Sequence, residues 1–289
     1  MRVGFGMAAV GVALVMALTQ VSAASAQTPA SAPPGDDWTL ASDDDVTAAV
    51  IGYDSGIDIV VRCAGGRFET LIAGLPPATG RTRELRFSDG PGPGQPDTWY
   101  VGRYPTVAVT TFPARFARSL REGGSLNMVV PGGAENGRNL RYVLDLPASP
   151  SAINATLTAC GKPIDDPRDA LIEEVAEGGL PEGIAWRRAP EPNYPDRRMY
   201  EWGFASVSCL SDPGGVLRQC EVEAEHPLDG GFGQATLNAV RAARVEVRGQ
   251  RGAPVPRRMI VFTTRFGMSE IDRGTPTRAP TGSRLTRPD

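Results

Sequence analysis

The sequence predicts an α+β fold: a mainly-β, sandwich-like domain with a closing helix, then a small domain with a three-stranded antiparallel sheet. Three observations predict this fold. The first half holds short runs of β-branched and aromatic residues between Gly, Pro and Asp clusters. The second half has the order helix, strand, strand, helix, strand. The four cysteines form an even set, which in an exported chain favours two disulfide bonds.

The amino-terminal segment has the pattern of a secretory signal peptide. An apolar stretch from Val3 to Val21 follows one basic residue and precedes a run of small residues. Ala24 and Ala26 match the small side chains that signal peptidase requires, so we expect cleavage after Ala26 and a periplasmic protein beginning at Gln27. The alternative is an uncleaved anchor, because the apolar run approaches the roughly 20 residues that cross a bilayer.

The charge balance bounds the class of partner. The chain has 30 Lys and Arg against 33 Asp and Glu, a formal net charge of −3. This balance gives no overall attraction to nucleic acid or to anionic lipid. We therefore expect no nucleic-acid partner and, after cleavage of the leader, no membrane insertion.

Composition divides the rest of the chain into segments. Residues 27–37 are rich in Pro, Ala and Ser, which predicts a flexible lead-in before a first domain over 38–161. A connector with a short helix is expected over 162–189. A second domain over 190–267 then precedes a disordered tail over 268–289.

Strands dominate the first domain. They are expected at 46–53, 57–63, 68–72, 84–87, 99–102, 107–112, 126–130 and 140–146, a spacing that favours an antiparallel sandwich or barrel. A helix is predicted over 113–121. A second helix, capped by Ser149 or Ser151, carries Cys160 at its end. In the connector, Asp166-Pro167 predicts the start of a helix with Leu171, Ile172 and Val175 on its apolar side, ended by Gly178-Gly179.

The cysteines suggest a pairing. Cys209 and Cys220 lie symmetrically about the turn centred on Gly214-Gly215, so they should face each other across a hairpin. Cys63 and Cys160 are then left to pair and to hold the closing helix on a strand. In the chain-entropy model such a long closed loop contributes about 4 to 5 kcal/mol.

The hairpin register also follows from this turn. Strands are expected from Phe204 to Leu210 and from Val216 to Glu225, with paired residue numbers summing to 429. The pairs Ala205–Ala224, Val207–Val222 and Cys209–Cys220 would then share one buried face. The opposite face, with Ser206, Ser208, Gln219, Glu221 and Glu223, is expected to meet solvent. A helix ending near Arg244, with Thr236, Val240 and Ala243 facing the sheet, and a last strand over 258–266 complete the domain.

This second domain resembles the C-terminal domain of TonB. The residues that carry the resemblance are Tyr194-Pro195, Gly214-Gly215, Pro227 to Phe232, Leu237 to Val245, Gly252 to Val255 and Met259 to Phe266. The chain departs from the family at Ala243-Arg244-Val245, where the usual pattern is aromatic-Arg-aromatic, and in its hairpin cysteines. The resemblance implies that the domain accepts an extended peptide, such as that of an outer-membrane transporter, along the edge of its sheet.

A sheet edge offers unpaired N–H and C=O groups that a further strand can complete. The expected partner-binding edge is the last strand, through Met259, Val261, Thr263 and Arg265. The alternative is an edge blocked by the tail or by dimerisation. Six nearby arginines could steer an acidic peptide or could simply be solvated: Arg241, Arg244, Arg248, Arg251, Arg257 and Arg258. Transduction of force would also need a retained membrane anchor.

The first domain resembles, more loosely, the secreted domains of VasI and of invasion-associated locus B proteins. The residues concerned are Trp38, Val61-Arg62-Cys63, Trp99, Phe116 to Leu120 and Leu157 to Gly161. This resemblance implies the alternative of an envelope or secretion accessory protein that acts through its first domain.

Enzymatic and metal sites find little support in the sequence. A zinc site or a Ser-His-Asp site would have to use His226, the only histidine, which precedes a proline and is expected in a solvated turn. Asp43-Asp44-Asp45 lacks the spacing of a calcium loop, and Asp165-Asp166 is explained by helix capping. Gly90 to Gly94 and Gly230 to Gly233 lack the Lys-Ser/Thr of a phosphate loop. We expect a non-enzymatic adaptor without cofactor or metal; a hydrolase with an unrecognised site is the alternative.

Overall fold

The computed structural model describes residues 37–88, 90, 92–173, 180–195 and 200–267. The predicted signal peptide, nearly all of the lead-in and the tail lie outside these ranges. So do Val175 and Gly178-Gly179 of the connector, and residues 196–199, which belong to the first helix expected in the second domain. None of the helices within the described ranges has the length and hydropathy needed to cross a bilayer.

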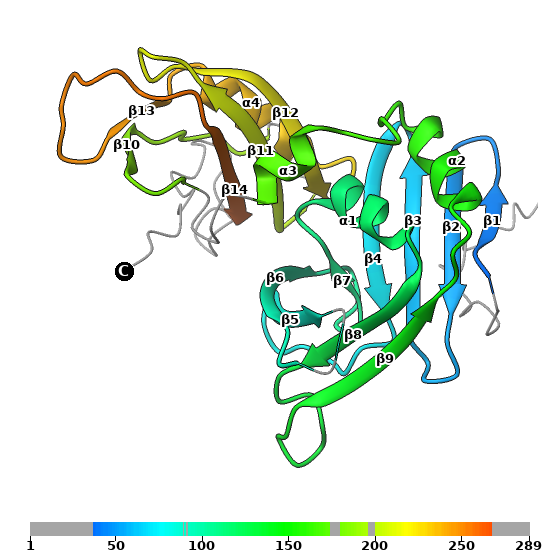
Figure 1. The fold of residues 1–289 in the computed structure, drawn as a ribbon. Coiled ribbons are helices and arrows are strands. Elements are labelled where there is room, and N and C mark those ends of the chain that lie inside the picture. The colour runs from blue at the N-terminus through cyan, green and yellow to red at the C-terminus, as the bar shows by residue number, and fades with distance from the viewer. Residues whose placement is uncertain (1–36, 89, 91, 174–179, 196–199, 268–289) are drawn as a thin grey trace, which may run out of the picture. The chain divides into compact units, whose positions relative to one another are not determined.

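This part of the chain is mostly β, with four helices and three sheets, in agreement with a mixed α+β class (Figure 1). The strands are β1 (Thr39–Ser42), β2 (Val46–Gly52), β3 (Asp58–Ala64), β4 (Arg67–Ala73), β5 (Thr82–Ser88), β6 (Gln95–Val101), β7 (Ala108–Val109), β8 (Gly124–Val130), β9 (Leu140–Leu146), β10 (Ile184–Arg188), β11 (Trp202–Ser211), β12 (Leu217–His226), β13 (Arg244–Val247) and β14 (Met259–Gly267). The helices are α1 (Pro113–Leu120), α2 (Ser151–Ala159), α3 (Arg168–Glu173) and α4 (Phe232–Val240).

The large sheet has nine strands in the order β1-β2-β3-β4-β7-β6-β5-β8-β9, and its neighbouring strands are antiparallel. The sequence predicts a sandwich-like arrangement, whereas these strands form one continuous hydrogen-bonded sheet. Side chains from β2 to β9 share a single core with α1 and α2, including Ile59, Trp99 and Leu144. Because two packed sheets and one curled sheet bury the same alternating positions, the sequence pattern does not distinguish them.

Three short strands were not predicted. All four residues of β1 are exposed, so this strand lacks the alternating pattern that marks a half-buried strand. β10 and β13 pair with each other in a separate ribbon. β13 begins at Arg244, where the sequence predicts the end of a helix; α4 ends earlier, at Val240. A four-residue strand paired with a distant segment leaves no local signal.

The small sheet has the order β12-β11-β14, and its central strand β11 is buried on both faces. On one face, α4 and the ribbon cover side chains such as Val207. On the other, Phe204 of β11 stacks on Tyr100 of β6 with ring centroids 3.8 Å apart. Ile172 of α3 packs on Val261 of β14 on this second face. The sheet is therefore an inner layer, with α4 and the ribbon on one side and α3 and the large sheet on the other.

The solvent face predicted for the hairpin is accordingly wrong for two of its members. Ser206 and Ser208 have no exposed surface. Ser208 donates a hydrogen bond to Glu223 and accepts one from Arg168 of α3. A row of polar side chains on a strand can therefore face either water or a polar interface inside the protein. Gln219, from the same predicted face, is exposed.

Bulges alter the predicted hairpin register. Val207 faces Val222, as predicted, but Ala205 faces Glu225 rather than Ala224 because the register shifts by one residue between these pairs. Such a bulge moves the following side chains to the opposite face. Ala224 thus joins the cluster around Tyr100 instead of the buried face that holds Val207.

Both disulfide bonds favoured by the sequence are present. Cys63–Cys160 joins β3 to the end of α2, with Cα atoms 5.4 Å apart. Cys209–Cys220 joins β11 to β12, with Cα atoms 4.1 Å apart. Disulfide bonds persist in oxidising compartments, which agrees with an exported chain.

The two bonds should differ in their contribution to stability. They close loops of 97 and 11 residues in sequence separation, for which the chain-entropy model gives about 4.7 and about 2.8 kcal/mol. We expect the pair Cys63→Ala, Cys160→Ala to lower the free energy of unfolding by about 2 kcal/mol more than the pair Cys209→Ala, Cys220→Ala. Urea unfolding of the two double variants measures this difference, and equal losses would contradict it.

Candidate functional site

The outer edge of β14 is the principal candidate. Among the strands that the structure describes, β14 pairs only with β11, in a register that runs from Trp202–Gly267 to Leu210–Met259. The backbone N–H of Ser211 donates to the carbonyl of Arg258 at 3.0 Å. In an antiparallel pair, hydrogen-bonded and non-hydrogen-bonded positions alternate, so this bond fixes the direction of every backbone group along the strand.

The alternation places the expected edge residues on the outside. Starting from Arg258, every second residue of β14 directs its N–H and C=O toward β11. The residues between them direct the same groups away from β11, and these are Met259, Val261, Thr263 and Arg265. The backbone groups of the four residues named from the sequence therefore point outward, and their binding of a partner stays a prediction.

The opposite edge of the small sheet is less accessible. Along β12, the carbonyl of Gln219 accepts a hydrogen bond from the guanidinium of Arg168 at 3.3 Å. The loop that follows β12 is held by Arg67, which donates to the carbonyl of Leu228. Side chains therefore already occupy acceptors on that side, whereas β14 lies on the other.

The side chains of the same four residues fasten β14 to the rest of the molecule. Val261 is buried under α3, and the hydroxyls of Thr263 and Ser206 are 2.7 Å apart. Arg265 donates from Nε to the hydroxyl of Tyr100 at 2.9 Å, with its guanidinium over the ring. Burial raises the pKa of Tyr100, although the charge and hydrogen bond of Arg265 oppose this. Because these side chains point away from the edge, side-chain substitution perturbs the core rather than the edge itself.

A pocket of about 680 Å³ opens at the start of β14. Its lining comes from α3, from the turn before β10, from β11, from the first residue of β14 and from the two residues that precede β14: Leu171, Pro181, Glu182, Gly183, Leu210, Arg257, Arg258 and Met259. Leu171 is 39% exposed, and its side chain is apolar. The pocket therefore combines an apolar wall with charged groups at the end of the candidate edge.

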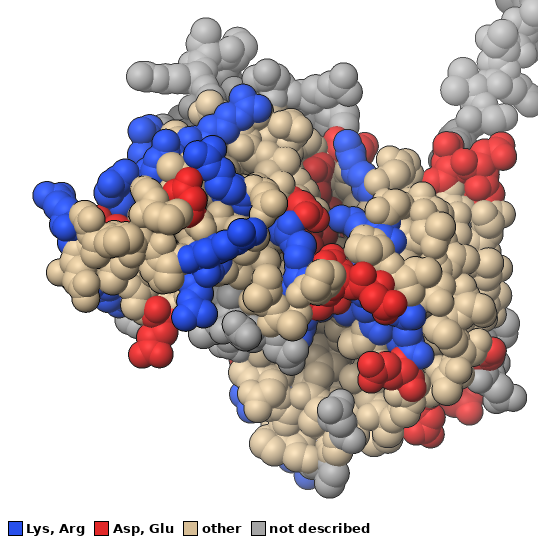
Figure 2. All heavy atoms as spheres, turned by 45° about the horizontal axis from the view of Figure 1, so that its top comes forward, with Lys and Arg blue, Asp and Glu red and all other residues tan. Residues whose placement is uncertain are grey.

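Arginines surround this end of the small sheet. Of the six that the sequence indicates, five are exposed and Arg244 is half-buried, donating to the carbonyls of Arg241 and Ala243. Figure 2 shows Lys and Arg side chains gathered over the side of the molecule that carries α4, β10 and β13. In a chain of net charge −3, this is a local excess of positive charge.

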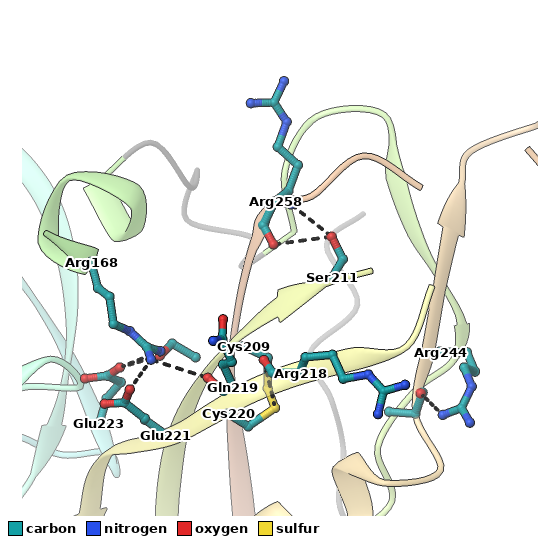
Figure 3. Close-up of a disulfide and its surroundings, with 12 residues drawn as sticks. Arg168, Cys209, Ser211, Arg218, Gln219, Cys220, Glu221, Glu223, Arg244 and Arg258 are labelled. Carbon is teal, nitrogen blue, oxygen red and sulfur yellow. Dashed lines mark hydrogen bonds and ion pairs between the residues drawn. A yellow bond between two sulfur atoms is a disulfide. The ribbon is translucent and has the colours of Figure 1, made fainter. Parts of the chain in front are cut away.

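Arg168 ties α3 to the small sheet, as Figure 3 shows. Its guanidinium forms ion pairs with Glu221 and Glu223 of β12 and donates to the hydroxyl of Ser208. Burial raises the pKa of Glu223, and the hydrogen bond from Ser208 only partly offsets that effect. At the start of α3, Asp166 accepts a hydrogen bond from the backbone N–H of Arg168 at 2.9 Å, the capping role that the sequence predicts.

His226 differs from its prediction. The sequence places it in a solvated turn, but it ends β12 and is 9% exposed. Its Nδ1 lies 2.8 Å from Oε1 of Glu69, whose Oε2 accepts from Nε of Arg62 at 2.8 Å. The ring also stacks on Phe204. These contacts link the large and small sheets, and the pocket at β14 is lined by neither His226 nor Glu69.

The carboxylate of Glu69 should make stability depend on pH. Burial alone raises its pKa, but the hydrogen bond with His226 and the charge of Arg62 more than compensate, so the pKa of Glu69 lies below its usual range. A lowered folded-state pKa gives stability that is present above the unfolded value of about 4.3 and is lost as pH falls through the folded value.

We therefore expect Glu69→Gln to lower the free energy of unfolding by about 1–3 kcal/mol at neutral pH, with a smaller loss below about pH 4. Urea unfolding between pH 3 and 7 measures both values. Glu84→Gln is the control, because Glu84 pairs with Arg86 at the exposed surface. Such pairs contribute about 0–1 kcal/mol to the free energy of unfolding. A loss from Glu69→Gln that stays constant with pH would refute this role.

Sequence reasoning missed Glu69, Arg168 and the position of Leu171. Glu69 had a signal, since Arg62 faces it directly in the β3–β4 hairpin and opposite charges are favourable at such positions. Leu171 was predicted on the packed side of the connector helix, and only the tertiary structure brings it to the pocket. No protein-family model, curated protein or solved structure matches this chain.

Proposed function

We propose that this chain is a periplasmic, non-enzymatic binding protein that recognises an extended peptide, or an extended segment of an envelope protein, by strand addition to β14. The observation that carries the proposal is the outward backbone of Met259, Val261, Thr263 and Arg265 on a strand whose side chains are fastened from one face. A rigid template is suited to this mode, because the partner alone loses conformational entropy.

The resemblance to the C-terminal domain of TonB supports the same mode. The order β11, β12, α4, β14 follows the expected pattern of a hairpin, a helix and a final strand. Tyr194 packs edge-on against Phe232 and Phe266, so three aromatic positions that carry the resemblance meet in one cluster. The ribbon β10–β13 and the hairpin disulfide are additions to that pattern. A link to TonB-dependent transport is part of this proposal.

The energetics favour weak and reversible binding. Each backbone hydrogen bond contributes about 0.5–1.5 kcal/mol net, and association itself costs at least about 4 kcal/mol. Four outward residues present four N–H and four C=O groups, so they can form up to roughly eight such bonds with one added strand, while each partner residue that becomes ordered costs about 1–2 kcal/mol. Backbone pairing alone therefore gives little affinity, and side-chain contacts must supply the specificity.

Whether the leader is cleaved distinguishes an adaptor, which needs no membrane anchor, from a force transducer, which needs one. We expect the protein purified from a bacterial envelope to begin at Gln27, to be soluble, and to weigh about 4 Da less than the reduced chain, two hydrogens for each disulfide bond. Envelope fractionation with intact-mass analysis measures this. A membrane-bound species that retains Met1 would instead indicate an anchored energy transducer.

Hydrogen exchange tests whether the edge is open. The amides of Val261 and Thr263 should exchange faster than those of Ile260 and Phe262 by at least about tenfold, because only the latter pair donates to β11. Exchange monitored by NMR at several protein concentrations checks this. Protection of Val261 and Thr263 at all concentrations would indicate that this chain covers its own edge, and protection that grows with concentration would indicate a second copy.

Proline substitution provides matched variants. Thr263→Pro removes an outward N–H, whereas Thr264→Pro removes a donor to β11. Each proline variant is compared with the valine variant at the same position. We expect the loss in free energy of unfolding to be larger for Thr264→Pro than for Thr263→Pro, by at least about 2 kcal/mol. The valine variants account for each lost hydroxyl. Equal losses in urea unfolding would mean that the backbone of Thr263 is engaged inside the fold.

A further inference from the structure

The pocket at the start of β14 has a chemistry of its own. Leu171, Leu210 and Met259 give it an apolar wall, and the guanidiniums of Arg257 and Arg258 stand at its rim. Arg258 is exposed and, among the residues that the structure describes, its side chain has no ion pair; in Figure 3 it points away from the sheet. Among the same described residues Arg257 also has no ion pair; its Nη2 donates a hydrogen bond to the side-chain oxygen of Gln219 at 3.0 Å.

Charge at the rim favours an anion. The lining contains one carboxylate, that of Glu182, and two guanidiniums, those of Arg257 and Arg258. A third exposed arginine, Arg248, is held close by, because its backbone N–H donates to the carbonyl of Gly183 at 2.7 Å. Guanidinium groups bind carboxylates through paired N–H donors, and the apolar wall beside them accepts an aliphatic side chain. The lining therefore fits a segment in which an apolar residue is flanked by acidic ones.

We propose that this pocket anchors the partner peptide by an aliphatic side chain and neighbouring carboxylates, while the adjoining residues of the peptide add to β14. The inference rests on the proposed strand addition and names its specificity. It also assigns a role to α3 and the Pro181–Gly183 turn, which lie outside the segment that resembles TonB. Backbone pairing gives the partner its extended form, and the pocket selects its sequence and fixes its register.

The probes are fluorescent synthetic peptides of defined chemistry. Because the pocket lies at the start of β14, Val-Thr-Val-Thr-Val-Asp-Leu-Asp presents the anchor to an antiparallel added strand, and Asp-Leu-Asp-Val-Thr-Val-Thr-Val presents it to a parallel one. Versions with Asn or Lys in place of Asp, and with Ala in place of Leu, complete the set. Binding to the full chain is followed by fluorescence anisotropy at low and high salt.

We expect one of the two Asp peptides to bind at least about fivefold tighter than its Asn version, with a preference that weakens at high salt. The Leu-to-Ala peptide, and the protein variant Leu171→Ala, should each weaken binding by about tenfold. The double variant Arg257→Glu, Arg258→Glu should reverse the charge preference and favour the Lys peptide. Thr263→Pro should abolish binding of every peptide, while Thr263→Val should not.

Other outcomes separate this inference from the proposed function. If Asp, Asn and Lys peptides bind alike, the charge-reversed variant is unchanged and Thr263→Pro abolishes binding, strand addition stands and the acidic anchor is refuted. If Asp peptides depend on the arginines but not on Thr263→Pro, binding is a surface contact and both proposals fail. The same holds if no peptide binds the wild-type chain, including the case in which hydrogen exchange shows its edge already covered.

Discussion

The rest of the structure depends on the burial of β11, the central strand of the small sheet, on both of its faces. The stack of Tyr100 on Phe204 covers one of these faces. The ring centroids lie 3.8 Å apart, and Val109 and Ala224 complete the cluster. Because this central strand is covered on both sides, an extended partner can add to the sheet only at its edges. This makes the direction of each backbone group along β14 the decisive feature of the candidate site.

Polar pairs fix how that burial is achieved. Glu69 lies 1% exposed between Arg62 and His226, and Arg168 connects α3 to Glu221 and Glu223. Buried charges are costly unless each is paired, so these contacts permit few alternative positions of α3 and of the two sheets. In consequence the pocket wall, which α3 contributes, is held at the start of β14.

The sequence predicted local features well and interfaces poorly. The limits of β9, the disulfide pairing and the pair Val207–Val222 follow from alternation and turn position, which act over a few residues. Ser208 and His226 were placed in solvent because polar residues in turns and on strand faces are usually exposed. Their burial depends on the packing of the small sheet against α3 and the large sheet, which no local pattern encodes. The strand period also fixes that the outward backbone groups of the four edge residues point together, and their binding of a partner stays a prediction.

The second hairpin bulge links the disulfide to the pocket. Gln219 lies beside Cys220 in the stretch of β12 where the register shifts. Its φ is 48°, an uncommon conformation for a residue other than glycine. In this conformation its carbonyl accepts from Arg168 of α3, and its side-chain oxygen accepts from Arg257 at the pocket rim. Bulges commonly re-aim side chains beside functional sites. The neighbouring disulfide restrains the bulge, so one strained residue orients both α3, which carries the apolar wall, and an arginine of the charged rim.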